Sequence, residues 1–93
     1  DKIDEYRKKI RKEEEILDVK AKMEEYMFLG LRLLEGISIS EFKRRFQKDI
    51  FEIYGDVIED LLNKQMLTKE DDRIRLTKKG IDISNMVLSE FII

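Results

Sequence analysis

Residues 24–36 (EEYMFLGLRLLEG) carry more apolar surface than one face of a helix can bury. The apolar residues of this stretch are Tyr26, Met27, Phe28, Leu29, Leu31, Leu33 and Leu34. In a helix they would occupy most of the circumference, whereas an amphipathic surface helix has a single apolar stripe. We therefore predict a helix over residues 23–35 that is covered on two sides. A chain of 93 residues builds one small domain, so we expect one of the two covering surfaces to come from elsewhere.

The residues that the chain lacks exclude several kinds of site. It has no cysteine and no histidine, which are the usual protein ligands of zinc, haem iron and iron–sulfur clusters. Histidine is also the commonest general base. The glycines are isolated, so they form no phosphate-binding loop. We therefore predict no catalytic, cofactor-binding or metal-binding residue in this chain, and we expect the fragment by itself not to be an enzyme.

The first residues and the hydropathy of the chain indicate where in the cell the protein is expected. No apolar run approaches the roughly 20 residues of a membrane span. The first residues are charged, unlike those of a signal peptide. A cytoplasmic protein is the corresponding expectation. The chain begins at Asp1 rather than at Met, so we also expect it to be a piece of a longer polypeptide or to have lost a tag by processing.

Residues 1–22 are predicted to be a linker or an extra helix that precedes a domain over residues 23–93. Ile3, Tyr6 and Ile10 recur at the spacing of one helical face. The basic run RKKIRK is followed by the acidic run EEEILD, and opposite charges three or four positions apart support a helix. The basic run fits either a phosphate-binding patch or a solvated helix beside compensating acidic residues, and we favour the second interpretation.

Helix-capping residues divide the rest of the chain. Gly36 is predicted to cap the first helix in a left-handed conformation. Ser38 and Glu41 have the spacing of a capping box at the start of a second helix. Asp49 is predicted to cap a third helix that ends at about Lys64.

Apolar spacing predicts which faces of these helices are buried. Phe42 and Phe46, one turn apart, should face inward. The buried face of the third helix is predicted to consist of Phe51, Tyr54, Ile58, Leu61 and Leu62. Gly55 lies in the middle of that helix, where glycine is about 1 kcal/mol less favourable than alanine. We therefore expect a neighbouring helix to approach closely there.

The C-terminal third predicts a hairpin and a last helix. Residues 66–69 and 73–76 flank an acidic turn, and Ile74 and Leu76 alternate with arginines as in a strand. Thr77 is predicted to cap a helix over residues 78 to about 91. The apolar side of this last helix is predicted to consist of Ile81, Val87, Leu88 and Phe91. The predicted fold is mostly α with a small β-hairpin: a winged-helix-like three-helix core, a wing and a C-terminal helix.

A winged helix raises the question of DNA binding, in which the third helix usually enters the major groove. Residues 49–63 contain five Asp or Glu residues and no Lys or Arg, and each negative charge opposes phosphate binding. Nucleic-acid binding is therefore disfavoured. A stand-alone winged-helix regulator that binds DNA or protein remains the alternative function, with Arg73 and Arg75 as backbone contacts or as residues that keep an edge strand unpaired.

The apolar helix and the segment after it resemble a known family. The sequence EEYMFLGLRLLEGISISEFKRRF is similar to the start of the C-terminal domain of the oxygen-independent coproporphyrinogen III oxidase family, which comprises radical S-adenosylmethionine enzymes and their haem-chaperone-like relatives. The resemblance rests on Glu25, an apolar run, Gly30-Leu31-Arg32, an apolar pair and Gly36, and it continues through Phe42, Phe46, Tyr54 and RIRLTKKG. One departure is Gln47, where many relatives have glycine.

The resemblance implies a longer parent protein that is an oxidoreductase of porphyrin biosynthesis or a haem-binding protein. Its catalytic barrel would hold a [4Fe–4S] cluster and S-adenosylmethionine, and it would decarboxylate coproporphyrinogen III oxidatively or bind haem. This chain would be a non-catalytic accessory domain that packs on the barrel and helps to cover the substrate opening. The barrel is then its expected partner, and the isolated fragment is expected to be able to self-associate.

Three residues of the apolar helix are candidates for contacts with the barrel or the substrate: Arg32, Tyr26 and Phe28. Arg32 could meet a substrate propionate or a barrel carboxylate. The alternative, which we favour, is a structural ion pair of Arg32 with Glu25, Glu35 or Glu59.

Overall fold

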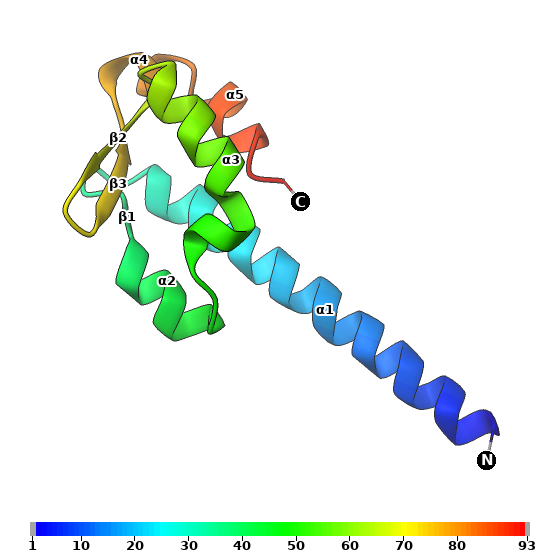
Figure 1. Cartoon of the computed structure of the whole chain (residues 1–93). Coiled ribbons are helices and arrows are strands. Elements are labelled where there is room, and N and C mark those ends of the chain that lie inside the picture. The colour runs from blue at the N-terminus through cyan, green and yellow to red at the C-terminus, as the bar shows by residue number, and fades with distance from the viewer. Residues whose placement is uncertain (1, 93) are drawn as a thin grey trace.

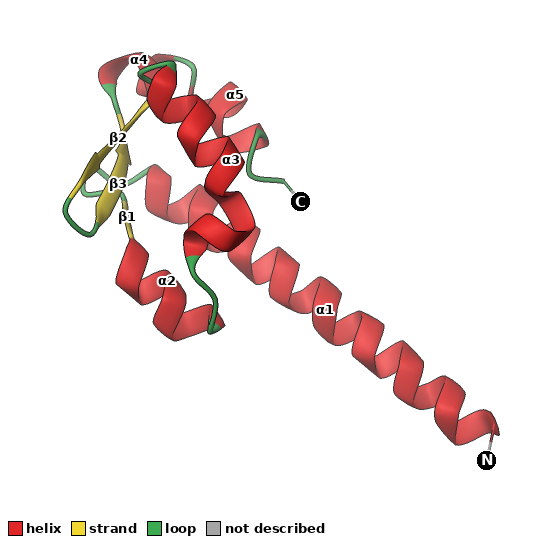
Figure 2. Ribbon diagram, viewed as in Figure 1, coloured by secondary structure: helices red, strands yellow, loops and turns green. Residues whose placement is uncertain are grey.

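The computed structural model describes the backbone of residues 2–92 and the side chains of residues 15–92. This part of the chain is mostly helical with a small antiparallel sheet (Figures 1 and 2), as predicted, and the order of its elements is compatible with a winged helix. The elements are α1 (Lys2–Leu31), β1 (Ile37–Ser38), α2 (Ile39–Phe46), α3 (Ile50–Asn63), β2 (Leu67–Glu70), β3 (Arg73–Leu76), α4 (Lys78–Asp82) and α5 (Ser84–Ser89).

The long helix α1 differs from the prediction at both ends. It runs without a break through residue 22, and its N-terminal part projects away from the other elements (Figure 1). It ends at Leu31 rather than at Glu35, and residues 32–35 form turns. Gly36 is therefore not its cap. Gly36 does adopt a left-handed conformation with φ 72°, and a Cβ at this position would collide with the carbonyl oxygen of Ile74, so glycine allows β3 to approach.

The predicted hairpin is present and gains a third strand. β2 pairs with β3 antiparallel, with Leu67 opposite Leu76 and Glu70 opposite Arg73. β1 pairs with the other edge of β3 through Ile37 and Ile74, so the strand order is β1-β3-β2. β1 comprises two residues, too few to show strand periodicity in the sequence.

All three predicted N-caps are confirmed. Ser38 Oγ accepts a hydrogen bond from the Glu41 N–H at 3.1 Å, and Asp49 Oδ1 accepts one from the Phe51 N–H at 2.9 Å. Thr77 Oγ1 accepts one from the Gly80 N–H at 3.1 Å. These bonds satisfy N–H groups that the first turn of each helix leaves unpaired.

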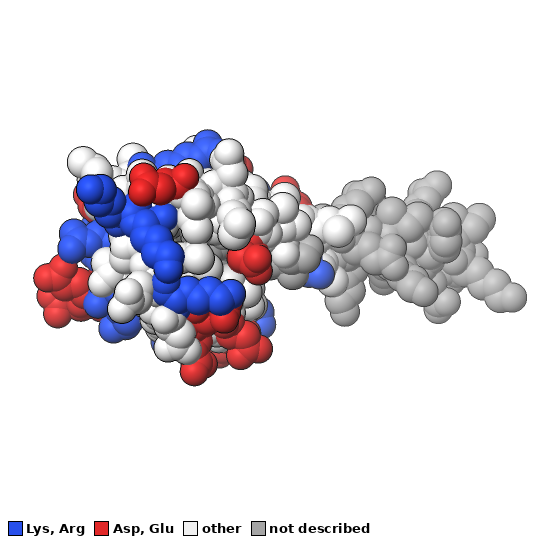
Figure 3. Space-filling view, turned by 90° about the horizontal axis from the view of Figure 1, so that it is seen from above, with Lys and Arg blue, Asp and Glu red and all other residues white. Residues whose placement is uncertain are grey.

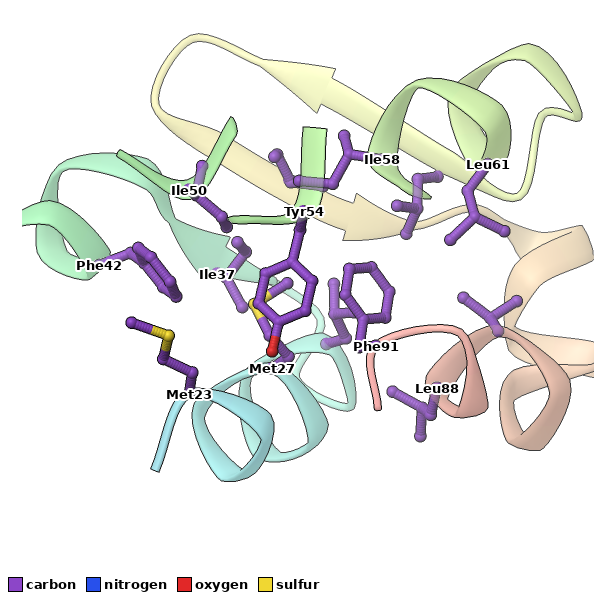
Figure 4. Packing of buried hydrophobic residues seen from close by; sticks show 14 residues of the cluster. Met23, Met27, Ile37, Phe42, Ile50, Tyr54, Ile58, Leu61, Leu88 and Phe91 are labelled. Atoms are coloured by element: carbon purple, nitrogen blue, oxygen red, sulfur yellow. The ribbon is translucent and has the colours of Figure 1, made fainter. Parts of the chain in front are cut away.

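The core lies where α1, α3, α5 and the sheet meet (Figure 4). Met23, Met27 and Leu31 supply its α1 side at helical spacing. The other buried apolar residues are Ile37, Phe42, Ile50, Tyr54, Ile58, Leu61, Leu67, Ile74, Val87, Leu88 and Phe91.

Two predictions about α3 are wrong. Phe51 is 41% exposed, and Ile50, one position earlier, is buried in its place. A Cβ on Gly55 would touch only the Cβ of Phe51 at 3.8 Å, within the same helix. No neighbouring helix approaches Gly55 among the described residues, so close packing does not explain this glycine.

The C-terminal helix is also different from the prediction. It is divided at Ile83 into α4 and α5. Val87, Leu88 and Phe91 are buried as predicted, whereas Ile81 on α4 is 52% exposed. Because the chain bends at Ile83, α4 no longer shares the inward face of α5, and Ile81 points to solvent.

Candidate interface around Arg32

Arg32 lies directly after the last residue of α1, between two shallow hollows of the surface. The first hollow has a volume of about 220 Å³ and is lined, besides Arg32, by Leu31, Leu33, Leu34, Leu76, Ile81 and Ser84. The second has a volume of about 210 Å³ and is lined, besides Arg32, by Phe28, Asn85, Leu88, Ser89 and Ile92. Because Arg32 lines both hollows, they form one continuous surface, which we call the Arg32 face.

The Arg32 face is apolar and open to solvent. Leu34 is 88% exposed, and Ile92 is 62% exposed. Leu33 and Ile81 also leave more than half of their area in water. Single exposed apolar residues are normal, but a contiguous group on one surface is typical of an interaction site.

The predicted structural partners of Arg32 are not found. Among the described side chains, Arg32 forms no ion pair with Glu25, Glu35 or Glu59. The ion pairs between described side chains join Asp18 to Lys22, Asp60 to Lys64 and Glu70 to Arg75. Arg32 is an exposed residue.

The other two candidate residues lie in different surroundings. Phe28 is partly buried and shares the second hollow with Arg32. Tyr26 lines a separate hollow of about 260 Å³ on another side of α1. The structure thus brings Phe28 to Arg32 and keeps Tyr26 away from both.

Tyr26 holds α1 against the start of α2. Its hydroxyl donates a hydrogen bond to the Ser38 carbonyl oxygen at 3.0 Å and accepts one from the Ser38 N–H at 3.2 Å. In the predicted capping box that N–H would bond to the Glu41 side chain, so the Glu41 half of the prediction is wrong and Tyr26 takes its place. The Tyr26 ring also makes edge contacts with the rings of Phe42 and Phe46, at centroid distances of 5.7 and 5.9 Å. Burial raises the pKa of Tyr26, although the hydrogen bond to Ser38 acts in the opposite direction.

A cluster of hydroxyl and carboxylate groups joins the hairpin turn to the start of α2. Asp72 Oδ2 accepts hydrogen bonds from Ser38 Oγ at 2.6 Å and from Ser40 Oγ at 2.7 Å. Asp72 Oδ1 accepts one from the Ser40 N–H at 2.9 Å. These bonds, from Ser38 first, lower the pKa of Asp72. The three hydrogen bonds tie the hairpin turn to the first turn of α2.

The charge distribution opposes the usual mode of DNA binding by a winged helix. On α3, Glu52, Asp56, Glu59 and Asp60 are exposed, and the helix carries no Lys or Arg. In the view of Figure 3, the Lys and Arg side chains form a stripe with Asp and Glu side chains on both sides of it. Such alternation differs from the broad basic surface of a nucleic-acid-binding domain.

The described residues show neither a metal-binding cluster nor a membrane-spanning helix. Among the described residues, no group of three His, Cys, Asp or Glu side chains is arranged to hold a metal ion. An iron–sulfur cluster does not fit this chain, because it has no cysteine. No helix in the described part of the chain is both long and apolar enough to cross a bilayer.

Sequence reasoning missed the residues that the C-terminal third contributes to the Arg32 face, among them Ile81 and Ile92. Ile81 was assigned to the core of a continuous last helix, and Ile92 was not assigned. Their exposure depends on the bend at Ile83 and on the end of α5 at Ser89. No local signal in the sequence marks either feature.

The chain belongs to the HemN C-terminal domain family, whose model matches residues 17–83. This match confirms the family resemblance that was inferred from the apolar helix. The chain is 36% identical over 80 residues to the heme chaperone HemW of Lactococcus lactis subsp. lactis (strain IL1403), covering 86% of this chain and 21% of that protein. It is 30% identical over 70 residues to the heme chaperone HemW of Bacillus subtilis (strain 168), covering 75% of this chain and 18% of that protein. No solved structure matches the chain significantly.

Proposed function

We propose that this chain is the non-catalytic C-terminal accessory domain of a HemN-like radical S-adenosylmethionine protein. In this proposal it packs on the catalytic barrel of its parent and helps to cover the substrate opening. The observation that carries the proposal is the exposed apolar Arg32 face, with Leu34 88% and Ile92 62% exposed. Such a surface needs a cover. The relatives extend well beyond the matched region, since the chain spans 21% and 18% of their lengths.

The parent's chemistry is part of the same proposal. The [4Fe–4S] cluster and S-adenosylmethionine would be bound by the barrel, since the present chain has no cysteine. The parent would bind haem or decarboxylate coproporphyrinogen III. Both relatives are called heme chaperones, which favours haem binding over the oxidase reaction. This chain would exclude water from one side of the barrel and would hold the edge of the barrel in place.

Binding in trans tests the packing. The part of the parent polypeptide that precedes this chain is produced with the chain as a separate, tagged molecule. We expect the two to purify as a 1:1 complex, and we expect the double variant L34S/I81S to lose binding because it makes the Arg32 face polar. The matched control is L17S, which alters a residue that is 66% exposed on α1 outside this face.

The location of the contact can be measured as well. On complex formation, the amides of α5 and of residues 31–34 should exchange hydrogen for deuterium more slowly, because these segments form the Arg32 face. A wild-type chain that does not bind the preceding part of its parent, although circular dichroism shows it folded, would rule out the accessory role.

A further inference from the structure

We propose that Arg32 is the ionic anchor of the Arg32 face, and that the surface which covers it presents an Asp or Glu carboxylate to the guanidinium. This inference rests on the proposed function and adds the chemistry of the partner. The covering surface is assigned to the part of the parent polypeptide that precedes this chain.

The Arg32 face carries a positive charge that its own lining residues do not balance. Among the residues that the structure describes, Arg32 is the only charged residue that lines either hollow, and no acidic residue lines them. The hollow beside Tyr26 is different, because its cationic and anionic side chains are balanced: Lys22, Arg45 and Arg73 against Glu25, Glu35 and Glu41. A fourth hollow, between α1 and α3, has Lys20 and Lys48 with Glu15 and Glu52. The Arg32 face is thus the one of these surfaces with uncompensated charge.

Covering the charge of Arg32 is unfavourable unless the covering surface supplies an acceptor. A guanidinium that loses water without gaining a hydrogen-bond acceptor is strongly destabilised. The neighbours of Arg32 that would be covered with it are apolar or carry neutral hydroxyl and amide groups: Phe28, Leu34, Ile81, Ser84, Asn85 and Ile92. None of them can neutralise the charge, so a tight interface needs an anion from the other side. A carboxylate fits best, because arginine binds it through two parallel hydrogen bonds.

The preceding part of the parent polypeptide is the expected source of the carboxylate. The matched family is a C-terminal domain, and the chain spans 21% and 18% of its relatives. Most of such a polypeptide therefore lies before this domain, and it is present at high effective concentration because the two parts are covalently joined. A second copy of this chain fits less well, because its own Arg32 face carries the same positive charge.

Affinity measurements in trans test the anchor. Binding of the chain to the preceding part of its parent is measured for wild type, R32Q, R32K and R44Q. We expect R32Q to weaken binding about tenfold or more, the range for loss of a charge-assisted pair, and R32K to recover part of the affinity. R44Q is the matched control, since Arg44 is also exposed, lies on α2 and lines neither hollow.

A zero-length cross-link identifies the partner group. A carbodiimide joins a lysine amine to a carboxylate in contact with it, with loss of water. In the complex of R32K we expect a cross-link from position 32 to an Asp or Glu of the preceding part, found by mass spectrometry. R44K should give no cross-link from position 44.

The outcomes separate this inference from the proposed function. If the wild-type chain does not bind, the accessory role fails and the anchor fails with it. If wild type binds and R32Q binds equally well, the accessory role stands and the anchor is wrong. A cross-link from position 32 to a second copy of the chain would overturn the assignment to the parent. Binding of free haem by the isolated chain that R32Q abolishes would assign Arg32 to a propionate instead.

Discussion

Gly55 shows how a single residue can be less than optimal without a packing reason. A Cβ at this position would make one ordinary contact, with Phe51 Cβ at 3.8 Å. Alanine is about 1 kcal/mol better than glycine inside a helix, so we expect G55A to raise the free energy of unfolding by about 0.5–1 kcal/mol in urea titrations. G30A is the matched control, because a Cβ on Gly30 would collide with Cγ2 of Ile37. A destabilised G55A would contradict the absence of a close neighbour.

The two tyrosines Tyr54 and Tyr26 should respond oppositely to loss of the hydroxyl. Tyr54 is 3% exposed, and its hydroxyl has no hydrogen-bond partner among the described residues. The Tyr26 hydroxyl makes two hydrogen bonds to the backbone of Ser38. We expect Y54F to keep or increase the free energy of unfolding, and Y26F to lower it by about 1–2 kcal/mol. Denaturant titration of both variants checks this, and equal losses would contradict it.

The raised pKa of Tyr54 predicts that the folded chain loses stability at high pH. Burial, followed by the negative charge of Glu24, raises the pKa of Tyr54 from 10.0 to about 12. The folded chain therefore holds this proton more tightly than the unfolded chain does. The stabilisation is complete below about pH 10 and is lost as the pH rises towards 12. Between these values wild type should lose stability relative to Y54F, and parallel pH profiles of the two proteins would exclude this explanation.

At the scale of elements, the most consequential link joins the hairpin turn to α2. Asp72 receives hydrogen bonds from Ser38 and Ser40, and its carbonyl oxygen accepts one from the Ile39 N–H at 2.8 Å. We expect D72N to lower the denaturation midpoint at neutral pH. D71N is the matched control, since Asp71 is the residue directly before Asp72 in the same turn. Its left-handed φ of 53° is one that asparagine tolerates.

The pH dependence of D72N follows from the same bonds. They lower the pKa of Asp72 below 3.8, so the folded chain binds this proton more weakly than the unfolded chain. The stabilisation is therefore present above about pH 4 and is lost as the pH falls through the lowered pKa. Wild type and D72N should converge in acid. A difference that persists unchanged under acidic conditions would show that the carboxylate charge is not involved.

The elements that the sequence predicts well depend on neighbours along the chain. The caps Ser38, Asp49 and Thr77 each bond to an N–H two or three residues later, and the spacing of the residues is sufficient to recognise them. The hairpin was predicted for the same reason, since Ile74 and Leu76 alternate with arginines on one strand.

The errors depend on contacts between distant residues. α1 ends at Leu31 because residues 32–36 must turn back so that Ile37 can pair with Ile74. The leucines after Arg32 continue the apolar pattern, so periodicity alone extends the helix past its end. Phe28 and Arg32 could be proposed as contacts from their helix, but the surface that they form also needs Ile81 and Ile92 from the other end of the chain. Only the folded arrangement brings these residues together.

On the scale of the whole molecule, the core uses α1 only from Met23 onward, where Met23, Met27 and Leu31 are buried. The described side chains before that point are exposed from Glu15 to Lys22. The N-terminal part of α1 extends away from the body of the domain (Figure 1). Within the described part of the chain, the Arg32 face is left open to solvent, with Leu34 88% and Ile92 62% exposed.

The uncovered Arg32 face predicts how the isolated chain self-associates. In a two-fold dimer the face would meet itself and bring two Arg32 guanidiniums together, which opposes association. We expect weak, concentration-dependent self-association of wild type in sedimentation velocity, stronger association of R32Q and weaker association of L34S, because Leu34 is 88% exposed on this face. L17S should resemble wild type, since Leu17 lies on α1 outside the face. If L17S abolishes association while L34S does not, the contact between copies is made by the part of α1 around Leu17. If R32Q associates no more than wild type, the charge of Arg32 does not limit self-association.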